Sequence, residues 1–158
     1  MPRVADYFVV CGLDPDQDFP GPEAWDNHGD TVKLKSMVLD RVPAGDHKDA
    51  EFPQNLDMFC FPNGLRVESR TPADSQVKFS FVLTEVSGTQ LFCSALKFYE
   101  QQRMSADPAD SSPEQGEGNL VWVPKCICLV SHWPFFQQFS KFMEYVYMIY
   151  KNSSKSGG

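Results

Sequence analysis

The sequence contains no long apolar run and has few basic residues. No stretch approaches the roughly 20 apolar residues that a membrane-spanning helix needs, and Asp6 interrupts the N-terminal segment that a signal peptide would occupy. Fourteen Lys and Arg residues stand against 21 Asp and Glu residues, which gives a net charge of −7. The sequence therefore predicts a cytoplasmic protein without a transmembrane segment. It argues against nucleic acid or an anionic membrane as the main partner, because both require a basic face.

Cysteine is also scarce, and its placement argues against a disulfide framework. The cysteines are odd in number, and each lies in an apolar run that is typical of a strand: Cys11, Cys60, Cys93, Cys126 and Cys128. Buried thiols of this kind fit a reducing compartment. Cys126 and Cys128 lack the second Cys or His pair that a zinc site needs. We therefore expect five buried thiols and no zinc.

The motifs of calcium loops and of catalysis are absent as well. Asp14, Asp16 and Asp18 resemble the start of a calcium loop, but the loop's required glycine and final glutamate are missing. Ser131 and His132 are adjacent, without a nucleophile elbow or a third orienting residue, so they are expected to cap a helix. The scattered glycines form no phosphate-binding loop. We expect a protein that is not an enzyme and that binds no metal or cofactor.

What the sequence does contain is a set of apolar runs, enough for one domain with a sizeable core in 158 residues. These runs predict strands at residues 7–11, 56–61, 77–85, 89–99 and 121–130. The third and fourth flank the turn Val86-Ser87-Gly88 and predict a β-hairpin. Residues 31–41 fit a short helix or a strand, and the pattern does not decide between them.

Polar segments predict where the ordered domain is interrupted and where it ends. Residues 101–119 are rich in Asp, Ser, Pro and Gly and cannot bury enough apolar surface to offset the entropy of ordering, so they predict a disordered acidic loop. Residues 151–158 are polar and predict a flexible tail. The domain is therefore expected to span residues 1–150.

A helix is predicted to begin at Pro134, where the missing N–H of proline costs nothing. Apolar residues then recur at helical spacing: Phe135, Phe136, Phe139, Phe142, Met143, Val146, Ile149 and Tyr150. Beyond Glu144 the opposite face is apolar too, with Tyr145, Tyr147 and Met148. Two interpretations remain open at this point: the far end docks on a partner or on a larger assembly, or an aromatic fringe wraps the sheet edge.

Four segments, in this order, resemble the upstream module of the DENN domain family. They are ADYFVVCGL at 5–13, FP at 52–53 leading to MFCFPNG at 58–64, FSFVLT at 79–84 with its hairpin partner ending in FYE at 98–100, and KCICLVSHWPFF at 125–136. Each segment alone is a moderately specific indication of this family, and the four segments in this order are a more specific one. The match covers nearly the whole chain apart from its loops and tail.

The resemblance implies an α/β fold of the longin/profilin-like class, with a central antiparallel five-stranded sheet flanked by helices. It also implies a role as the N-terminal lobe of a guanine nucleotide exchange factor that binds a Rab GTPase together with central and downstream DENN modules. Such a protein would act in membrane traffic and would be peripheral on membranes through its partners. Exchange breaks no covalent bond, so a lack of catalytic residues suits this function. The alternative is a longin-like interaction scaffold without exchange activity.

The residues expected to contact the GTPase or the remaining DENN modules lie at the two ends of the predicted helix. They are His132, Trp133 and Phe136 at its start, and Tyr147 and Met148 at its far end. Packing of Trp133 and Phe136 on the sheet is the competing interpretation of those two side chains.

Overall fold

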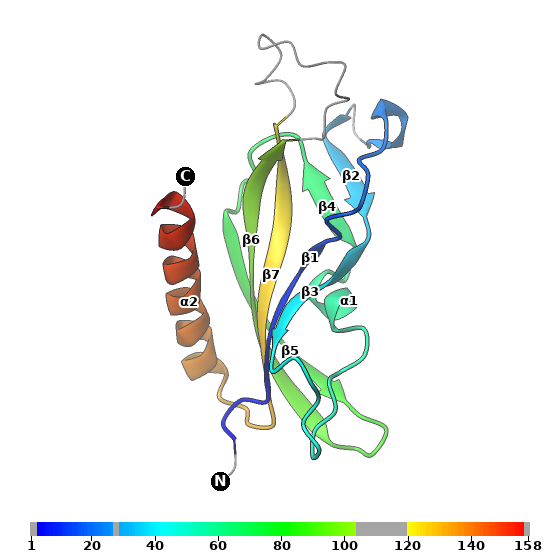
Figure 1. Cartoon of the computed structure of the whole chain (residues 1–158). Coiled ribbons are helices and arrows are strands. Elements are labelled where there is room, and N and C mark those ends of the chain that lie inside the picture. Colours follow the sequence, from blue (N-terminus) through cyan, green and yellow to red (C-terminus); the bar gives the residue numbers. More distant parts are fainter. Residues whose placement is uncertain (1–2, 27–28, 104–119, 157–158) are drawn as a thin grey trace.

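Antiparallel strands and two α-helices make up the part of the chain that the computed structural model describes, residues 3–26, 29–103 and 120–156 (Figure 1). The strands are β1 (Tyr7–Leu13), β2 (Thr31–Leu34), β3 (Ser36–Val42), β4 (Leu65–Glu68), β5 (Gln76–Thr84), β6 (Gln90–Arg103) and β7 (Leu120–Ser131). The helices are α1 (Leu56–Cys60) and α2 (Phe136–Ser156), and a short 3-10 helix, η1, spans Pro22–Ala24. The mixed α/β class predicted from the sequence is confirmed.

All seven described strands belong to one curled antiparallel sheet with β7 at its centre (Figure 1). One edge of β7 pairs with β6 from Ser131 to Leu120. Its other edge is shared, because β1 pairs with the C-terminal half of β7 and β4 pairs with it at Trp122. Beyond these, β3 extends the sheet from β1, β2 extends it from β4, and β5 extends it from β6. The expected count of five strands is therefore too low for the described residues.

The sheet separates two apolar clusters, because side chains alternate between the faces of a strand. Val9 of β1 belongs to the first cluster, which also takes Leu56 and Cys60 from α1. Phe8 and Val10 of the same strand pack against the second cluster, which lies under α2. The members of the second cluster are Leu96, Phe98, Ile127, Leu129, Phe139 and Met143. Strand β1 is therefore covered on both faces.

The predicted strand over residues 56–61 is wrong, since this segment forms the helix α1. Leu56 and Cys60 are buried and lie four residues apart, on one side of a helical turn, whereas Met58 and Phe59 are exposed. A short apolar run does not reveal its own period, so pattern could not separate the two structures. A turn at Asn63 and Gly64 follows the helix, with Gly64 at φ +81°, and β4 begins directly after it.

The structure confirms the predicted hairpin, assigns residues 31–41 and corrects the start of the predicted loop. The predicted hairpin is confirmed as β5 and β6, with Gly88 at φ +90° in its turn. Residues 31–41, left undecided above, lie mostly in β2 and β3. The predicted disordered loop begins too early, because residues 101–103 continue β6, and residues 104–119 lie outside the described part.

Helix α2 also departs from its predicted limits. It begins at Phe136, two residues after Pro134, and it continues to Ser156. A flexible tail from residue 151 is therefore contradicted as far as Ser156. The capping prediction is wrong as well: Ser131 ends β7, and its Oγ accepts a hydrogen bond from the Trp133 N–H at 3.0 Å, before the helix begins.

Candidate partner-binding surface

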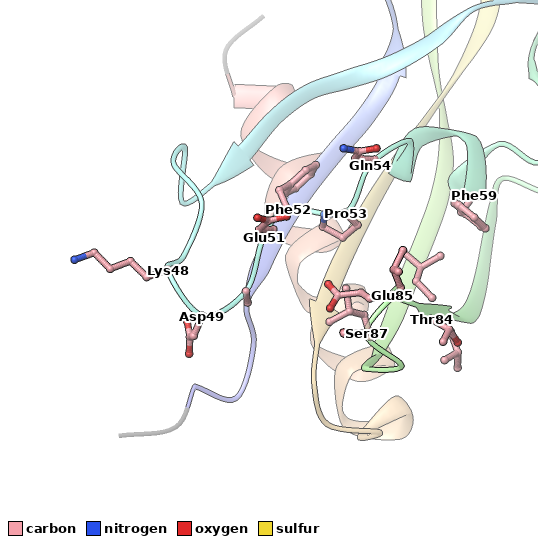
Figure 2. Close-up of a pocket in the computed structure, with 15 residues that line it drawn as sticks. Lys48, Asp49, Glu51, Phe52, Pro53, Gln54, Phe59, Thr84, Glu85 and Ser87 are labelled. Atoms are coloured by element: carbon pink, nitrogen blue, oxygen red, sulfur yellow. The ribbon is translucent and has the colours of Figure 1, made fainter.

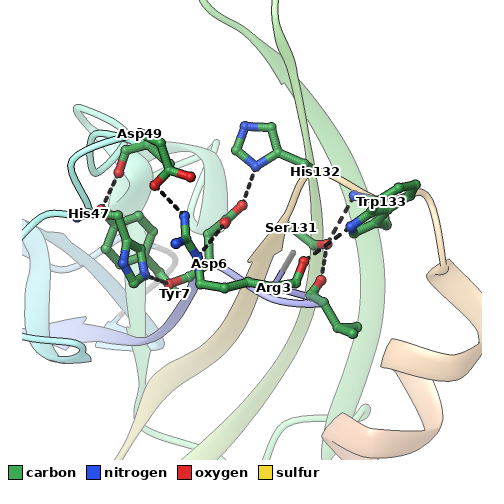
Figure 3. A network of polar contacts seen from close by, with 10 residues as sticks. Arg3, Asp6, Tyr7, His47, Asp49, Ser131, His132 and Trp133 are labelled. Atoms are coloured by element: carbon green, nitrogen blue, oxygen red, sulfur yellow. Dashed lines mark hydrogen bonds and ion pairs between the residues drawn. The ribbon is translucent and has the colours of Figure 1, made fainter. Parts of the chain in front are cut away.

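The buried carboxylate of Asp6 connects the start of the chain to the segment that leads into α2 (Figure 3). The Asp6 side chain is only 5% exposed, and it accepts a hydrogen bond from Nε of Arg3 at 3.2 Å. It also contacts Nδ1 of His132. Because a carboxylate only accepts hydrogen bonds, Nδ1 of His132 must carry the proton in this contact. A buried charge is costly unless paired, so these contacts hold the N-terminal segment against the end of β7.

The same network ties the loop before α1 to β1. Nε2 of His47 lies 2.8 Å from the main-chain oxygen of Asp6. The Tyr7 hydroxyl accepts a hydrogen bond from the His47 backbone N–H at 2.9 Å and donates one to the carbonyl of Ala50. His132 therefore belongs to a structural network that joins three separate segments of the chain.

Trp133 and Phe135 form an exposed aromatic ledge beside this network. Their rings are stacked, with centroids 5.9 Å apart and planes only 7° from parallel. Nε1 of Trp133 donates to the main-chain oxygen of Arg3 at 3.1 Å (Figure 3). This bond orients the indole, yet both aromatic side chains remain exposed. Trp133 is thus held in place with a free face.

Phe136 and Tyr147 pack on the sheet. The Phe136 ring meets Phe92 edge to face, with centroids 5.8 Å apart. The Tyr147 ring lies 4.9 Å from that of Phe98, within the cluster under α2. Of the far-end pair predicted above, only Met148 is open to solvent. The five predicted residues are therefore not one patch, and Trp133 and Met148 are the exposed members.

The sequence pattern identified only one residue, Tyr145, of an exposed apolar stripe on α2. Phe142, Tyr145 and Ile149 are spaced i, i+3 and i+7, so they lie on one side of the helix, and their exposed fractions are 48%, 62% and 49%. We call these three residues the α2 stripe. Phe142 and Ile149 also fit the period of the buried face, whose centre is Met143, so pattern alone assigned them to the core.

A polar contact anchors the far end of α2 to the sheet. Nζ of Lys125 lies 3.0 Å from a carboxylate oxygen of Glu100, and the Tyr150 hydroxyl donates to the same carboxylate. Burial lowers the pKa of Lys125, but the Glu100 carboxylate more than offsets this, and the pKa is raised. Burial, and then the hydrogen bond to Glu100, raise the pKa of Tyr150. Both groups are therefore stabilised in their protonated forms.

A hollow of about 700 Å³ lies elsewhere, between the loop of residues 48–54, Phe59 and the β5–β6 turn (Figure 2). Glu51 and Glu85 line it without a histidine or cysteine beside them. None of the five predicted contact residues borders it. Among the residues that the structure describes, no three His, Cys, Asp or Glu side chains gather as a metal site would require.

The cysteines are buried in the core, as predicted. Hydrogen bonding to Cys60, together with burial, raises the pKa of the Cys11 thiol. Hydrogen bonding to Cys60 and Cys93, together with burial, raises the pKa of Cys128. A thiol that stays protonated is a poor nucleophile and a poor metal ligand, so these side chains act as core residues.

The described part of the chain is a mixed α/β module, and Trp133 and Phe135 are exposed on its surface. The uDENN domain model matches residues 36–98, and the DENN (AEX-3) domain model matches residues 122–157, so together they cover more than half of the chain. The chain belongs to the DENN-domain family, which confirms the resemblance seen in the sequence.

Two relatives show how much of a DENN-domain protein this chain represents. It is 29% identical over 163 residues to the DENN domain and WD repeat-containing protein SCD1 of Arabidopsis thaliana, a match that covers 99% of this chain and 13% of that protein. It is 26% identical over 148 residues to the MAP kinase-activating death domain protein of Caenorhabditis elegans, which covers 85% of this chain and 10% of that protein. The chain thus spans about a tenth of each relative. No solved structure matches it.

Proposed function

We propose that this chain is the N-terminal lobe of a DENN-domain guanine nucleotide exchange factor for a Rab GTPase, acting in membrane traffic. The observation that carries the proposal is the order of the family matches, uDENN over residues 36–98 and DENN over residues 122–157, along one folded unit. The sheet with a helix on each face also supports a longin/profilin-like architecture for this lobe.

Nucleotide exchange does not require a catalytic centre on the surface that binds the GTPase. An exchange factor binds the nucleotide-free GTPase more tightly than the GDP-loaded form, and this difference in affinity shifts the equilibrium toward GDP release. Shape and apolar contact supply such a difference without a nucleophile or a tuned acid and base. The exposed aromatic ledge of Trp133 and Phe135 offers contact of this kind.

The α2 stripe is proposed to pack against the central DENN module. The DENN (AEX-3) domain model matches residues 122–157, a range that includes the whole stripe, and this supports the proposed contact. An apolar stripe at i, i+3 and i+7 is the usual face by which one helix packs on another. Met148 lies beside the stripe and would be covered at its border.

A GDP-release assay against a panel of Rab GTPases tests the proposal. We expect no acceleration by the 158-residue chain alone, and clear acceleration by the same chain followed by its central and downstream DENN modules. Binding of a Rab without faster release by the longer protein would instead favour an interaction scaffold. Absence of both binding and release across the panel would contradict the proposal.

A pair of variants in the longer protein tests the role of the α2 stripe. Tyr145→Ser combined with Ile149→Ser removes apolar contact and should lower the exchange rate by about tenfold, since a well-buried interface residue contributes upward of about 1.4 kcal/mol. The matched control is Gln137→Ser combined with Lys141→Ser, which changes two exposed polar residues of the same helix. Equal rates for the two double variants would contradict the assignment.

A further inference from the structure

The outer edge of β5 is an unpaired strand edge. β5 pairs with β6 over nine residues, and no strand of the described chain pairs with its other side. The backbone N–H of Glu85 donates to the carbonyl of Thr89 at 2.8 Å, which makes these two a hydrogen-bonded pair. Hydrogen-bonded pairs alternate along an antiparallel ladder, so the odd-numbered residues of β5 bond to β6. The even-numbered residues direct their N–H and C=O groups outward: Gln76, Lys78, Ser80, Val82 and Thr84.

Aromatic side chains line one face of β5 next to this edge. The rings of Phe79 and Phe81 are stacked with centroids 6.1 Å apart, and Phe59 of α1 stacks on Phe81 at 5.9 Å. Phe59 remains 47% exposed. A long strand edge bordered by exposed apolar surface is a site at which another strand can add, and natural proteins usually blunt such edges.

The two ends of β5 carry opposite local charge. Near its C-terminal end, the hollow of about 700 Å³ is lined by three carboxylates, Asp49, Glu51 and Glu85, against one ammonium, Lys48. Near its N-terminal end, a second hollow of about 330 Å³ borders Val77 and Phe79 and is lined by Arg66 and Lys97 against Glu68. The acidic end and the basic end are thus separated along a single strand.

We infer that β5 pairs antiparallel with β5 of a second copy of this chain, about a two-fold axis near Ser80 and Phe81. Antiparallel pairing sets the acidic end of one copy beside the basic end of the other, twice, because the contact is symmetric. It also places the Phe79 and Phe81 side chains of the two copies on one continuous face. The net charge of −7 on each chain opposes the association at long range, which keeps it reversible.

The test measures the oligomeric state of the 158-residue chain by sedimentation over a range of concentrations. We expect a monomer–dimer equilibrium, which Ser80→Pro should weaken by about tenfold or more because it removes an outward N–H and with it a central hydrogen bond in each copy. Proline is tolerated at an edge position whose N–H faces away from the sheet. The matched control, Ser80→Thr, keeps the N–H and should dimerise like the parent chain.

Charge reversal tests the antiparallel arrangement. Glu85→Lys should weaken the dimer at low salt, because it brings a positive charge to the basic end of the partner copy. Adding Lys97→Glu to the same chain restores opposite charges at both ends of the symmetric contact and should recover the affinity. A double variant as weak as Glu85→Lys would overturn the antiparallel arrangement.

Hydrogen exchange on the unmodified chain gives a readout that does not depend on a variant folding. The amides of Lys78, Ser80 and Val82 should gain protection as the concentration rises, whereas those of Phe79 and Phe81 should be protected throughout. A chain that stays monomeric, with fast exchange at the even-numbered amides at every concentration, would overturn the inference. That result would leave the edge to a strand from a different protein.

Discussion

At the residue scale, Asp6 joins segments that are far apart in the sequence. Its carboxylate meets Arg3 and His132, and its main-chain oxygen meets His47 (Figure 3). The side chain is nearly inaccessible, so water cannot replace a lost partner. Asp49 also meets Arg3, at 2.7 Å, but its side chain is 73% exposed. Asp6 and Asp49 therefore contact the same arginine and differ in burial, which makes Asp49 a matched control for Asp6.

We predict that Asp6→Asn lowers the free energy of unfolding by about 1–3 kcal/mol, because a buried hydrogen-bonded charge is lost and its partners are left unsatisfied. Chemical denaturation measures the change. Asp49→Asn, on the exposed side of the same arginine, should leave stability close to that of the parent chain. Similar losses for both variants would show that burial does not control the contribution of Asp6.

At the element scale, α2 is a helix with one face packed on β6 and β7 and another face left open. Met143 is buried at the centre of the packed face, and Tyr147 continues that face onto Phe98. Met148, one residue further along, is 60% exposed because one residue turns a helix by about 100°. Two neighbours in the sequence thus have different environments.

Serine substitutions at these neighbours should separate packing from exposure. Tyr147→Ser should lower the free energy of unfolding by about 1–2 kcal/mol, since it removes a ring packed against Phe98. Met148→Ser should change stability by less than about 0.5 kcal/mol and should raise solubility. Thermal unfolding and solubility measurements on the two variants check this, and a destabilised Met148→Ser chain would be the contradicting result.

The anchor of α2 at Lys125 and Tyr150 predicts a dependence of stability on alkaline pH. The pKa of each group is higher in the folded chain than its ordinary value, so folding favours the protonated forms. This stabilisation is present below the ordinary pKa values of about 10 and is lost as pH rises through the folded pKa values.

We therefore expect the free energy of unfolding to fall as the pH rises above about 10, measured by urea denaturation at a series of pH values. Tyr150→Phe removes one of the two groups and should make this fall less steep. A Tyr150→Phe chain with the same pH dependence as the parent would exclude a contribution from the phenol.

At the scale of the whole molecule, the excess of acidic residues governs which surfaces the chain can approach. The net charge is −7, and no helix in the described part of the chain is long and apolar enough to cross a membrane. Anionic lipid attracts clusters of Lys and Arg, so an acidic chain gains nothing from such a surface.

We predict that the chain alone does not sediment with vesicles containing phosphatidylserine at physiological salt. A basic peptide of similar concentration serves as the positive control for the vesicles. Salt-sensitive binding of the chain would contradict the prediction, because it would reveal a basic face that the overall charge conceals.

The sequence predicted four of the seven described strands, β1, β5, β6 and β7, and little of the candidate contact surface. Long runs such as residues 121–130 and the 77–99 hairpin carry their own periodicity and turn signal, so they were predicted well. The five-residue helix α1 is too short to show a period, and its helical form depends on burying Leu56 and Cys60 under the sheet. Among the contact residues, Trp133 and Met148 are exposed as expected, whereas Phe136 and Tyr147 are packed.

The sequence alone determined the α/β class, the strand over residues 121–130, the buried thiols and the membership in the DENN-domain family, because these depend on residue type and order along the chain. Only the tertiary structure decided that Phe142 and Ile149 lie open to solvent, that Asp6 joins three segments, and that one edge of β5 is unpaired. The physical reason is that exposure and pairing depend on which elements pack together, and contacts between distant segments leave no period in the sequence.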